Sequence, residues 1–246
     1  MTMADLEGRT ILLTRSAEDG AVWADALATR GARPVVFPCI GCEPIRDAAT
    51  SAALSGALEH AAWLALTSVR GVDGVARLHP EPLRGDLAIA VVGDKTAYAA
   101  RDAFGSVDLV APGGTAESMA RELLERLSPV GAGVGTVVAV GPESPRRDLE
   151  DILAPQGVQV VRVAVYRTVP AATEGPRQDL ARLGVDAIFL ASPSAVTGLM
   201  ARAEVTDEIH IITIGPSTTA AARQAGLRID GEATGRGLEA LIEAMP

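Results

Sequence analysis

Residues 189–199 read FLASPSAVTGL, and residues 65–75 read ALTSVRGVDGV. Each stretch begins with the apolar end of an expected strand and continues through a serine and a short polar turn into an expected helix. Ser68 and Ser192 occupy the same place in the two stretches, 124 residues apart. The chain therefore repeats one strand–turn–helix pattern at long range.

The similarity extends beyond these two stretches in both directions. Three pairs of segments correspond, at offsets of 124, 122 and 127: residues 65–75 with 189–199, residues 87–105 with 210–226, and the segments that begin at Gly8 and Gly135. A nearly constant offset of this size indicates a duplicated half-chain rather than a short-period solenoid.

Apolar runs of strand length alternate with stretches of helical spacing throughout both halves. The runs are nearly continuous, as in parallel strands that are buried on both faces; they are residues 10–14, 63–67, 88–93, 136–141, 187–192 and 211–215. Several of the helical stretches end in glycine, which suits a helix C-terminus; they are residues 19–31, 95–105, 116–127, 144–157 and 217–226. The alternation predicts parallel α/β sheets, whose ligands bind outside the carboxyl ends of the strands.

Two extended, proline-containing segments interrupt the alternation, VVFPCIGCEPI (35–45) and VVRVAVYRTVPA (160–171). Each closes the upstream repeat unit of its half, so we interpret residues 37–44 and 161–169 as paired linkers that cross together. The predicted fold class is α/β, with two similar parallel-sheet domains joined by a two-stranded linker and the first domain discontinuous. The expected domains are residues 1–36 with 170–246, and residues 45–160.

Composition limits the partners and the location of the protein. The 246 residues carry a net charge of −9, which argues against nucleic acid as a partner. No stretch reaches the roughly 18 consecutive apolar residues of a membrane helix. The first ten residues contain early acids and no apolar core, unlike a secretory signal, so we expect a cytoplasmic protein with no membrane contact.

Cys39 and Cys42 are the only cysteines, in the sequence CIGC. This spacing is compatible with a redox pair or with half of a zinc site. A zinc site needs more ligands than the chain offers nearby, and a redox pair should begin a helix, whereas EPI reads as extended chain. We interpret both cysteines as reduced thiols on a connecting segment.

Six motifs, in order and over most of the chain, resemble the uroporphyrinogen-III synthases of tetrapyrrole biosynthesis. They are ILLTR (11–15), LALTSVRGV (64–72), VVGDKTAYAARDAFG (91–105), VYRTVP (165–170), FLASPSAV (189–196) and IGPSTTAAARQAG (214–226). Departures include TRS where the family often has Thr-Arg-Pro. The resemblance implies two α/β domains joined by a two-stranded linker, as the duplication predicts independently.

The resemblance also implies a reaction, that of a cyclising hydro-lyase. Its substrate is hydroxymethylbilane, a linear tetrapyrrole with eight carboxylates, which closes to uroporphyrinogen III with loss of water and inversion of the last ring through a spiro intermediate. It implies no redox cofactor and no metal. It further implies a monomer that receives the substrate in a transient hand-over from hydroxymethylbilane synthase.

An acidic chain needs a way to bind these carboxylates, and the turns between strands and helices supply one. Helix N-termini offer unpaired N–H groups and the positive end of the helix dipole to anions. The expected substrate-binding residues lie at such turns: Thr14, Arg15, Ser68, Val69, Lys95, Thr96, Ser192, Ser194, Gly215, Ser217 and Thr218. The serines and threonines are equally compatible with plain helix caps, and Arg15 and Lys95 with ordinary surface charges.

Tyr166 is the expected catalytic residue. It lies in the VYRT motif, within the second expected linker. A phenol can donate a proton to the departing hydroxyl of the substrate as a general acid. Packing of this aromatic ring against a domain remains the alternative. Tyr98, Trp23 and Trp63 are expected to pack against their domains.

Three other functions compete with this interpretation. A non-catalytic two-lobed binding protein would share the architecture, since fold alone does not determine function. A nucleotide-dependent oxidoreductase should show G-x-G-x-x-G after the first strand, where LLTRSAEDG stands instead. A synthase homologue that lost its activity and became a regulatory protein is compatible with the same motifs.

Overall fold

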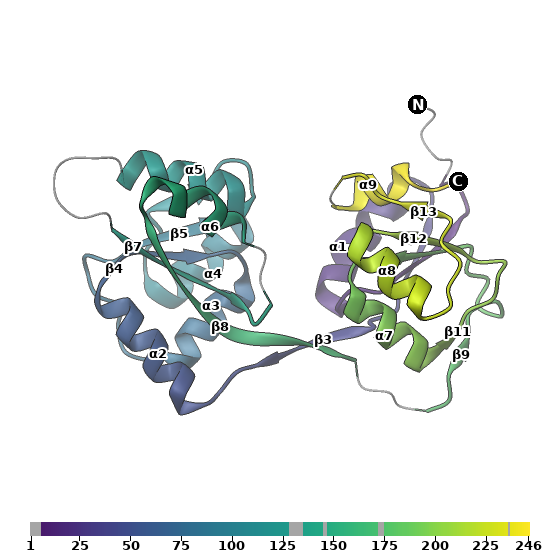
Figure 1. Ribbon diagram of the computed structural model, residues 1–246, viewed down its shortest axis with the longest axis horizontal. Helices are drawn as coiled ribbons and strands as arrows, with labels where there is room; N and C mark the ends of the chain where they lie inside the picture. Colours follow the sequence, from purple (N-terminus) through teal and green to yellow (C-terminus); the bar gives the residue numbers. More distant parts are fainter. Residues whose placement is uncertain (1–5, 128–134, 145–146, 172–174, 236) are drawn as a thin grey trace. The chain divides into compact units, whose positions relative to one another are not determined.

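The computed structural model describes residues 6–127, 135–144, 147–171, 175–235 and 237–246. Its contacts divide the chain into unit 1, Met1–Cys42 with Thr168–Pro246, and unit 2, Glu43–Arg167. The chain thus passes from one unit to the other twice, at residues 42–43 and 167–168, and both passages fall in segments expected to be linkers. Figure 1 shows the elements of each unit.

Unit 2 is built on a six-stranded sheet in the order β3-β8-β7-β4-β5-β6. The neighbours from β8 to β6 run parallel, and Leu64 of β4 lies opposite Ile89 of β5 and Val138 of β7. The strands are β3 (Ile40–Pro44), β4 (Ala61–Leu66), β5 (Ala88–Val92), β6 (Leu109–Ala111), β7 (Thr136–Pro142) and β8 (Gln159–Pro170).

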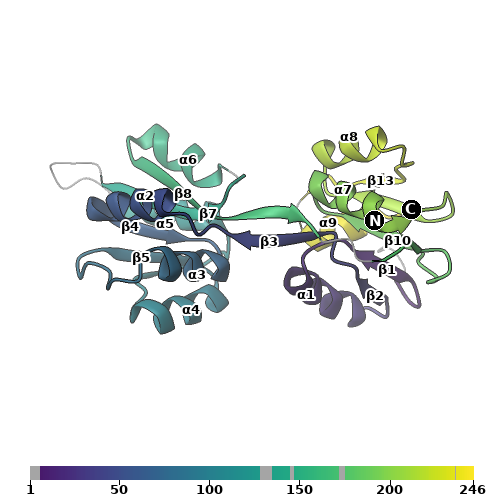
Figure 2. The ribbon, with the colours of Figure 1, turned by 90° about the horizontal axis from the view of Figure 1, so that it is seen from below.

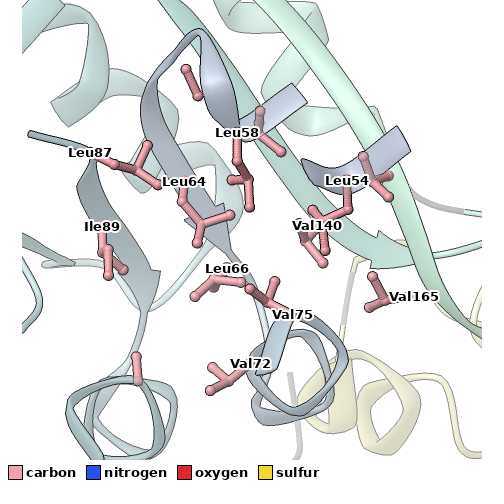
Figure 3. Packing of buried hydrophobic residues seen from close by; sticks show 14 of the residues in the cluster. Leu54, Leu58, Leu64, Leu66, Val72, Val75, Leu87, Ile89, Val140 and Val165 are labelled. Carbon is pink, nitrogen blue, oxygen red and sulfur yellow. The ribbon is translucent and has the colours of Figure 1, made fainter. Parts of the chain in front are cut away.

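Helices cover both faces of this sheet, because its strands are apolar on both sides. Leu64 and Leu66 point into one core cluster and Trp63 and Ala65 into the other, as the two-residue period of a strand requires. The first cluster (Figure 3) packs under α2 (Ala48–Glu59), α3 (Val69–Leu78) and α4 (Asp94–Phe104). The second packs under α5 (Ala116–Leu127) and α6 (Asp148–Leu153). Figure 2 shows α3 and α4 on one side of the sheet and α6 on the other.

Unit 1 repeats this architecture with five parallel strands in the order β13-β12-β10-β1-β2. Helices α1 and α9 cover one face and α7 and α8 the other. The strands are β1 (Thr10–Leu13), β2 (Arg33–Val36), β10 (Ala187–Leu190), β12 (His210–Thr213) and β13 (Gly231–Glu232); the helices are α1 (Ala17–Ala28), α7 (Pro193–Arg202), α8 (Pro216–Gln224) and α9 (Gly237–Glu243).

The α/β fold with parallel sheets predicted from the sequence is therefore confirmed, and each of the six predicted strands is present. The expected helix at 144–157 is shorter than predicted, with α6 followed by a 3₁₀ turn, Ala154–Gln156, while residues 145–146 lie outside the described part. A short parallel pair, β9 (Gln178–Asp179) with β11 (Ala203–Glu204), was not predicted because two residues carry no periodic signal.

One side-chain hydrogen bond at the edge of the sheet recurs in both units. The carboxylate of Asp108 accepts a hydrogen bond from Ile89 N at 2.8 Å, and that of Asp230 accepts one from Ile211 N at 2.9 Å. Each aspartate directly precedes a strand and holds the start of the neighbouring strand. Both members of the pair are shifted by the same 122 residues, so the duplication extends to individual side-chain contacts.

Strand β8 belongs to two ladders. Its residues 159–166 pair with β7, and it is also the neighbour of β3. The second ladder is antiparallel, because Ile45 N donates to Val165 O and Ala171 N donates to Cys39 O, both at 3.0 Å. Residues 161–166, expected in a linker, are thus part of the sheet of unit 2, since the twelve-residue strand is long enough for both pairings.

Candidate functional site

The carboxyl ends of the parallel strands of unit 2 bring several predicted site residues to one edge. Ser68 follows β4, Gly93 follows β5, and Tyr166 lies opposite Pro142 where β7 ends. These residues are far apart in the sequence. They share the edge because parallel strands end on the same side of a sheet.

Ser68 begins α3 as its N-cap residue. Its Oγ accepts a hydrogen bond from Gly71 N at 3.2 Å, so capping, one of the two expected roles, is present. Val69, the first residue of the helix, is partly exposed beside it. The cap uses an acceptor position of the hydroxyl and leaves its O–H able to donate.

Gly93 begins α4 with φ 75° and ψ 163°, a conformation that is essentially restricted to glycine. A Cβ at this position would meet no atom within 4 Å, so the turn is open. Lys95 is exposed and Thr96 is buried in the first turn of the helix. Tyr98 was expected to pack but is 71% exposed, which corrects that prediction.

Tyr166 is half-buried and packs against the core cluster that contains Val72 and Val75 of α3. Its backbone carbonyl accepts a hydrogen bond from Glu143 N at 2.9 Å. The ring therefore lies on the side of the sheet that α3 covers. The backbone of Tyr166 is held by the pairing of β8 with β7, although the sequence placed this residue in a linker.

In unit 1 the carboxyl edge carries the corresponding turns. Ser192 caps α7, and its Oγ accepts from Ala195 N at 3.2 Å and lies 3.0 Å from Ser194 Oγ. Gly215 precedes α8, where Ser217 is exposed and Thr218 is only 1% exposed. Thr218 Oγ1 has no hydrogen-bond partner among the described residues.

Thr14 and Arg15 follow β1 at the same edge and differ in accessibility. The Thr14 hydroxyl is buried and donates to Phe189 O at 2.8 Å, which ties β1 to β10. The Thr14 side chain is therefore buried in the sheet, where it links the two strands. The Arg15 guanidinium lies 4.3 Å from the Trp23 ring centre and 3.5 Å from a carboxylate oxygen of Asp19.

The sequence model of the family described as uroporphyrinogen-III synthase HemD matches residues 21–243. The chain belongs to the uroporphyrinogen-III synthase family. The matched range includes parts of both units and every turn described above except the one that contains Thr14 and Arg15.

Two curated members of the synthase family match parts of the chain. A putative uroporphyrinogen-III synthase of Methanocaldococcus jannaschii is 32% identical over 117 residues, 46% of each protein. The uroporphyrinogen-III synthase of Synechococcus elongatus is 28% identical over 172 residues, which are 68% of this chain and 64% of that protein. The matched region thus spans less than two thirds of the length of either relative.

Solved structures of synthases share the fold. The enzyme of Helicobacter pylori has a TM-score of 0.57 at 15% identity, with 96% of this chain and 97% of that chain covered. A mutant synthase of Thermus thermophilus has a TM-score of 0.50 at 19% identity, with 96% of each chain covered.

Cys39, one of the two cysteines of this synthase-family chain, lies in an environment that disfavours the thiolate. Cys39 is fully buried, and burial raises the pKa of its thiol to about 12, so it stays protonated at neutral pH. In the described ranges no group of three or more His, Cys, Asp or Glu side chains is placed to hold a metal ion. No helix there is long and apolar enough to cross a membrane.

Sequence reasoning missed the arginines around Tyr166. Arg77 of α3 contacts Val165, 88 residues away, and Arg46 follows the β3 segment that pairs with β8. Arg77 lies in the last turn of α3, and Arg46 lies in the connection between β3 and α2, where no local pattern marks it. Only the pairing of β3 with β8 brings them together.

Proposed function

We propose that this protein catalyses the closure of hydroxymethylbilane to uroporphyrinogen III with loss of water and inversion of the last ring. The observation that carries this proposal is membership of the uroporphyrinogen-III synthase family over residues 21–243. The strand-to-helix turns on both sheets supply the amide-rich sites that a substrate with many carboxylates needs.

Tyr166 is the proposed general acid. Its phenol donates a proton to the substrate hydroxyl, the carbon–oxygen bond breaks, and water leaves an azafulvene-like cation. The substituted carbon of the last pyrrole attacks this cation and forms the spiro intermediate, which fragments and closes again with the ring inverted. The proton that the last ring releases on regaining aromaticity restores the phenol.

A phenol, with a reference pKa near 10, is a weak acid for this step. It is sufficient because the closure also proceeds without an enzyme, although without inversion. The main task of the protein is then to hold the chain of pyrroles in the geometry that gives inversion.

The substrate carboxylates are held by open helix N-termini. In unit 2 these are the starts of α3 and α4, with Ser68, Val69, Lys95 and Thr96. In unit 1 they are the starts of α7 and α8, with Ser192, Ser194, Gly215, Ser217 and Thr218, and the loop after β1 adds Arg15. Backbone amides bind carboxylates without many basic side chains, which reconciles an anionic substrate with a net charge of −9.

The proposed reaction needs no metal or redox cofactor, and we place the protein in the cytoplasm as a monomer that takes its substrate from hydroxymethylbilane synthase. A coupled assay tests the activity. Hydroxymethylbilane is generated in situ, the protein is added with EDTA present, and the oxidised porphyrin isomers are separated by chromatography. Predominantly type III product is expected. Type I product alone, from a sample with a cooperative unfolding transition, would reject the proposal in favour of the non-catalytic binding or regulatory protein.

A further inference from the structure

Three segments of unit 2 converge on the peptide bond that joins Val165 to Tyr166. Arg77 Nη2 donates to Val165 O at 3.1 Å, and Ile45 N donates to the same oxygen at 3.0 Å. Arg77 comes from α3, and Ile45 directly precedes Arg46. Arg77 and the segment that carries Arg46 therefore meet at one carbonyl of β8, next to Tyr166.

Gly74 permits this approach. A Cβ at position 74 would overlap the Val165 side chain, so only glycine lets α3 lie close to β8. Arg77 follows one turn later, on the part of the helix that runs beside β8. The Tyr166 ring packs against the cluster that includes Val72 and Val75 of the same helix.

Neither arginine of this pair forms a salt bridge within the described part of the chain. The contacts of Arg77 are to backbone carbonyls, at Val165 and at Asp73 (3.4 Å), and its Nε is buried without a hydrogen-bond partner there. Burial, and then the neighbouring charge of Arg46, lower the pKa of Arg77, while Asp73 acts in the opposite direction. Arg46 is exposed and forms no salt bridge with any described residue.

Two guanidinium groups that repel one another and have no salt-bridge partner are stabilised by an anion. In a chain with a net charge of −9, such an arrangement next to the proposed general acid indicates a site for an anionic ligand. We propose that Arg46 and Arg77 bind one carboxylate of the linear tetrapyrrole and thereby position the substrate against Tyr166. This inference rests on the proposed function.

Neutral substitutions test the pair, with uroporphyrin III, an octacarboxylate, as the binding probe. Arg46→Gln and Arg77→Gln are compared with Arg121→Gln, which removes an exposed arginine of α5 on the other face of the sheet. Porphyrin fluorescence gives Kd, and the coupled assay gives KM, kcat and the ratio of type III to type I. We expect Kd and KM to rise about tenfold for each variant of the pair, with the Arg121 variant close to wild type.

Arg46→Gln carries the decisive result, because Arg77→Gln also removes a hydrogen bond to Val165 O and can weaken the fold. Loss of the Arg46 charge relieves repulsion, so we expect its Tm to be equal to or above that of the wild type while Kd rises. An unchanged Kd and KM for Arg46→Gln would overturn the inference even if Arg77→Gln is impaired.

The experiments can reject the proposed function and the proposed carboxylate site independently of one another. If the wild type forms no type III product but Arg46→Gln still weakens uroporphyrin binding, the proposed function is rejected and the carboxylate site stands. If the wild type forms type III product and Arg46→Gln matches it in Kd, KM and isomer ratio, the function stands and the site is rejected.

Discussion

Gly74 of α3 lies against Val165 of β8 with no room for a methyl group between them. Gly74→Ala gains about 1 kcal/mol in helix propensity, but overpacking at a buried contact costs about 1–3 kcal/mol. We expect a net loss of stability, measured by urea denaturation. Gly56→Ala in α2 is the matched control, since a Cβ there meets nothing within 4 Å and should increase stability. Equal effects at both positions would contradict the packing argument.

Tyr166→Phe keeps the ring that packs against the core and removes the proposed acid. We expect the rate of type III formation to fall about 100-fold, while the variant still unfolds in a cooperative transition. Tyr98→Phe serves as the control, because this exposed phenol on α4 has no assigned role. Wild-type turnover in the Tyr166 variant would exclude the phenol from the reaction.

Asp108→Ala removes the carboxylate that accepts from Ile89 N and leaves that amide without its side-chain acceptor. Loss of a charged acceptor from a partly buried hydrogen bond should cost about 1–3 kcal/mol. Hydrogen exchange at Ile89 should accelerate along with the fall in unfolding free energy. Asp102→Ala, an exposed position on α4, should leave both measurements unchanged.

Glu150 of α6 and Arg162 of β8 form a partly buried ion pair with an Nη2 to Oε2 distance of 2.6 Å. The hydrogen bond from Arg162 lowers the pKa of Glu150 below its ordinary value of 4.5. A lowered pKa stabilises the folded state fully above about pH 4.5, and this contribution disappears as the pH falls through the folded value.

Glu150→Gln should therefore be less stable than the wild type at pH 7, by about 1–2 kcal/mol, and the difference in unfolding free energy should be smaller at pH 3. Denaturation of both proteins at the two pH values checks this. Glu117→Gln, which breaks an exposed pair with Arg121, should change stability by less than about 0.5 kcal/mol. A difference of the same size at pH 7 and pH 3 would show that Glu150 acts through packing instead of charge.

The fold was predictable because each central strand is an apolar run that must be buried on both faces. The run around Leu64 and the run around Ile188 are examples, and both became inner strands. The length of β8 was not predictable. Tyr166 was assigned to a linker because proline and the extended pattern of residues 160–171 do not reveal pairing with β7.

The candidate site was predictable only where it follows a strand. Ser68 and Ser192 were found because a capping serine has a local signature. The burial of Thr14 depends on Phe189, 175 residues away, and the contact of Arg77 with Val165 depends on how α3 crosses the sheet. Such contacts arise from tertiary packing, for which a single sequence has no local pattern.

The discontinuous unit 1 has a consequence for synthesis on the ribosome. Its strand β1 lies between β2 and β10, and Leu12 pairs with Ile188. The first 42 residues therefore cannot complete their sheet until the last third of the chain has emerged. Residues 43–167, in contrast, emerge as one continuous segment. We expect unit 2 to acquire structure first during translation, with the apolar strand of residues 10–13 exposed meanwhile to chaperones.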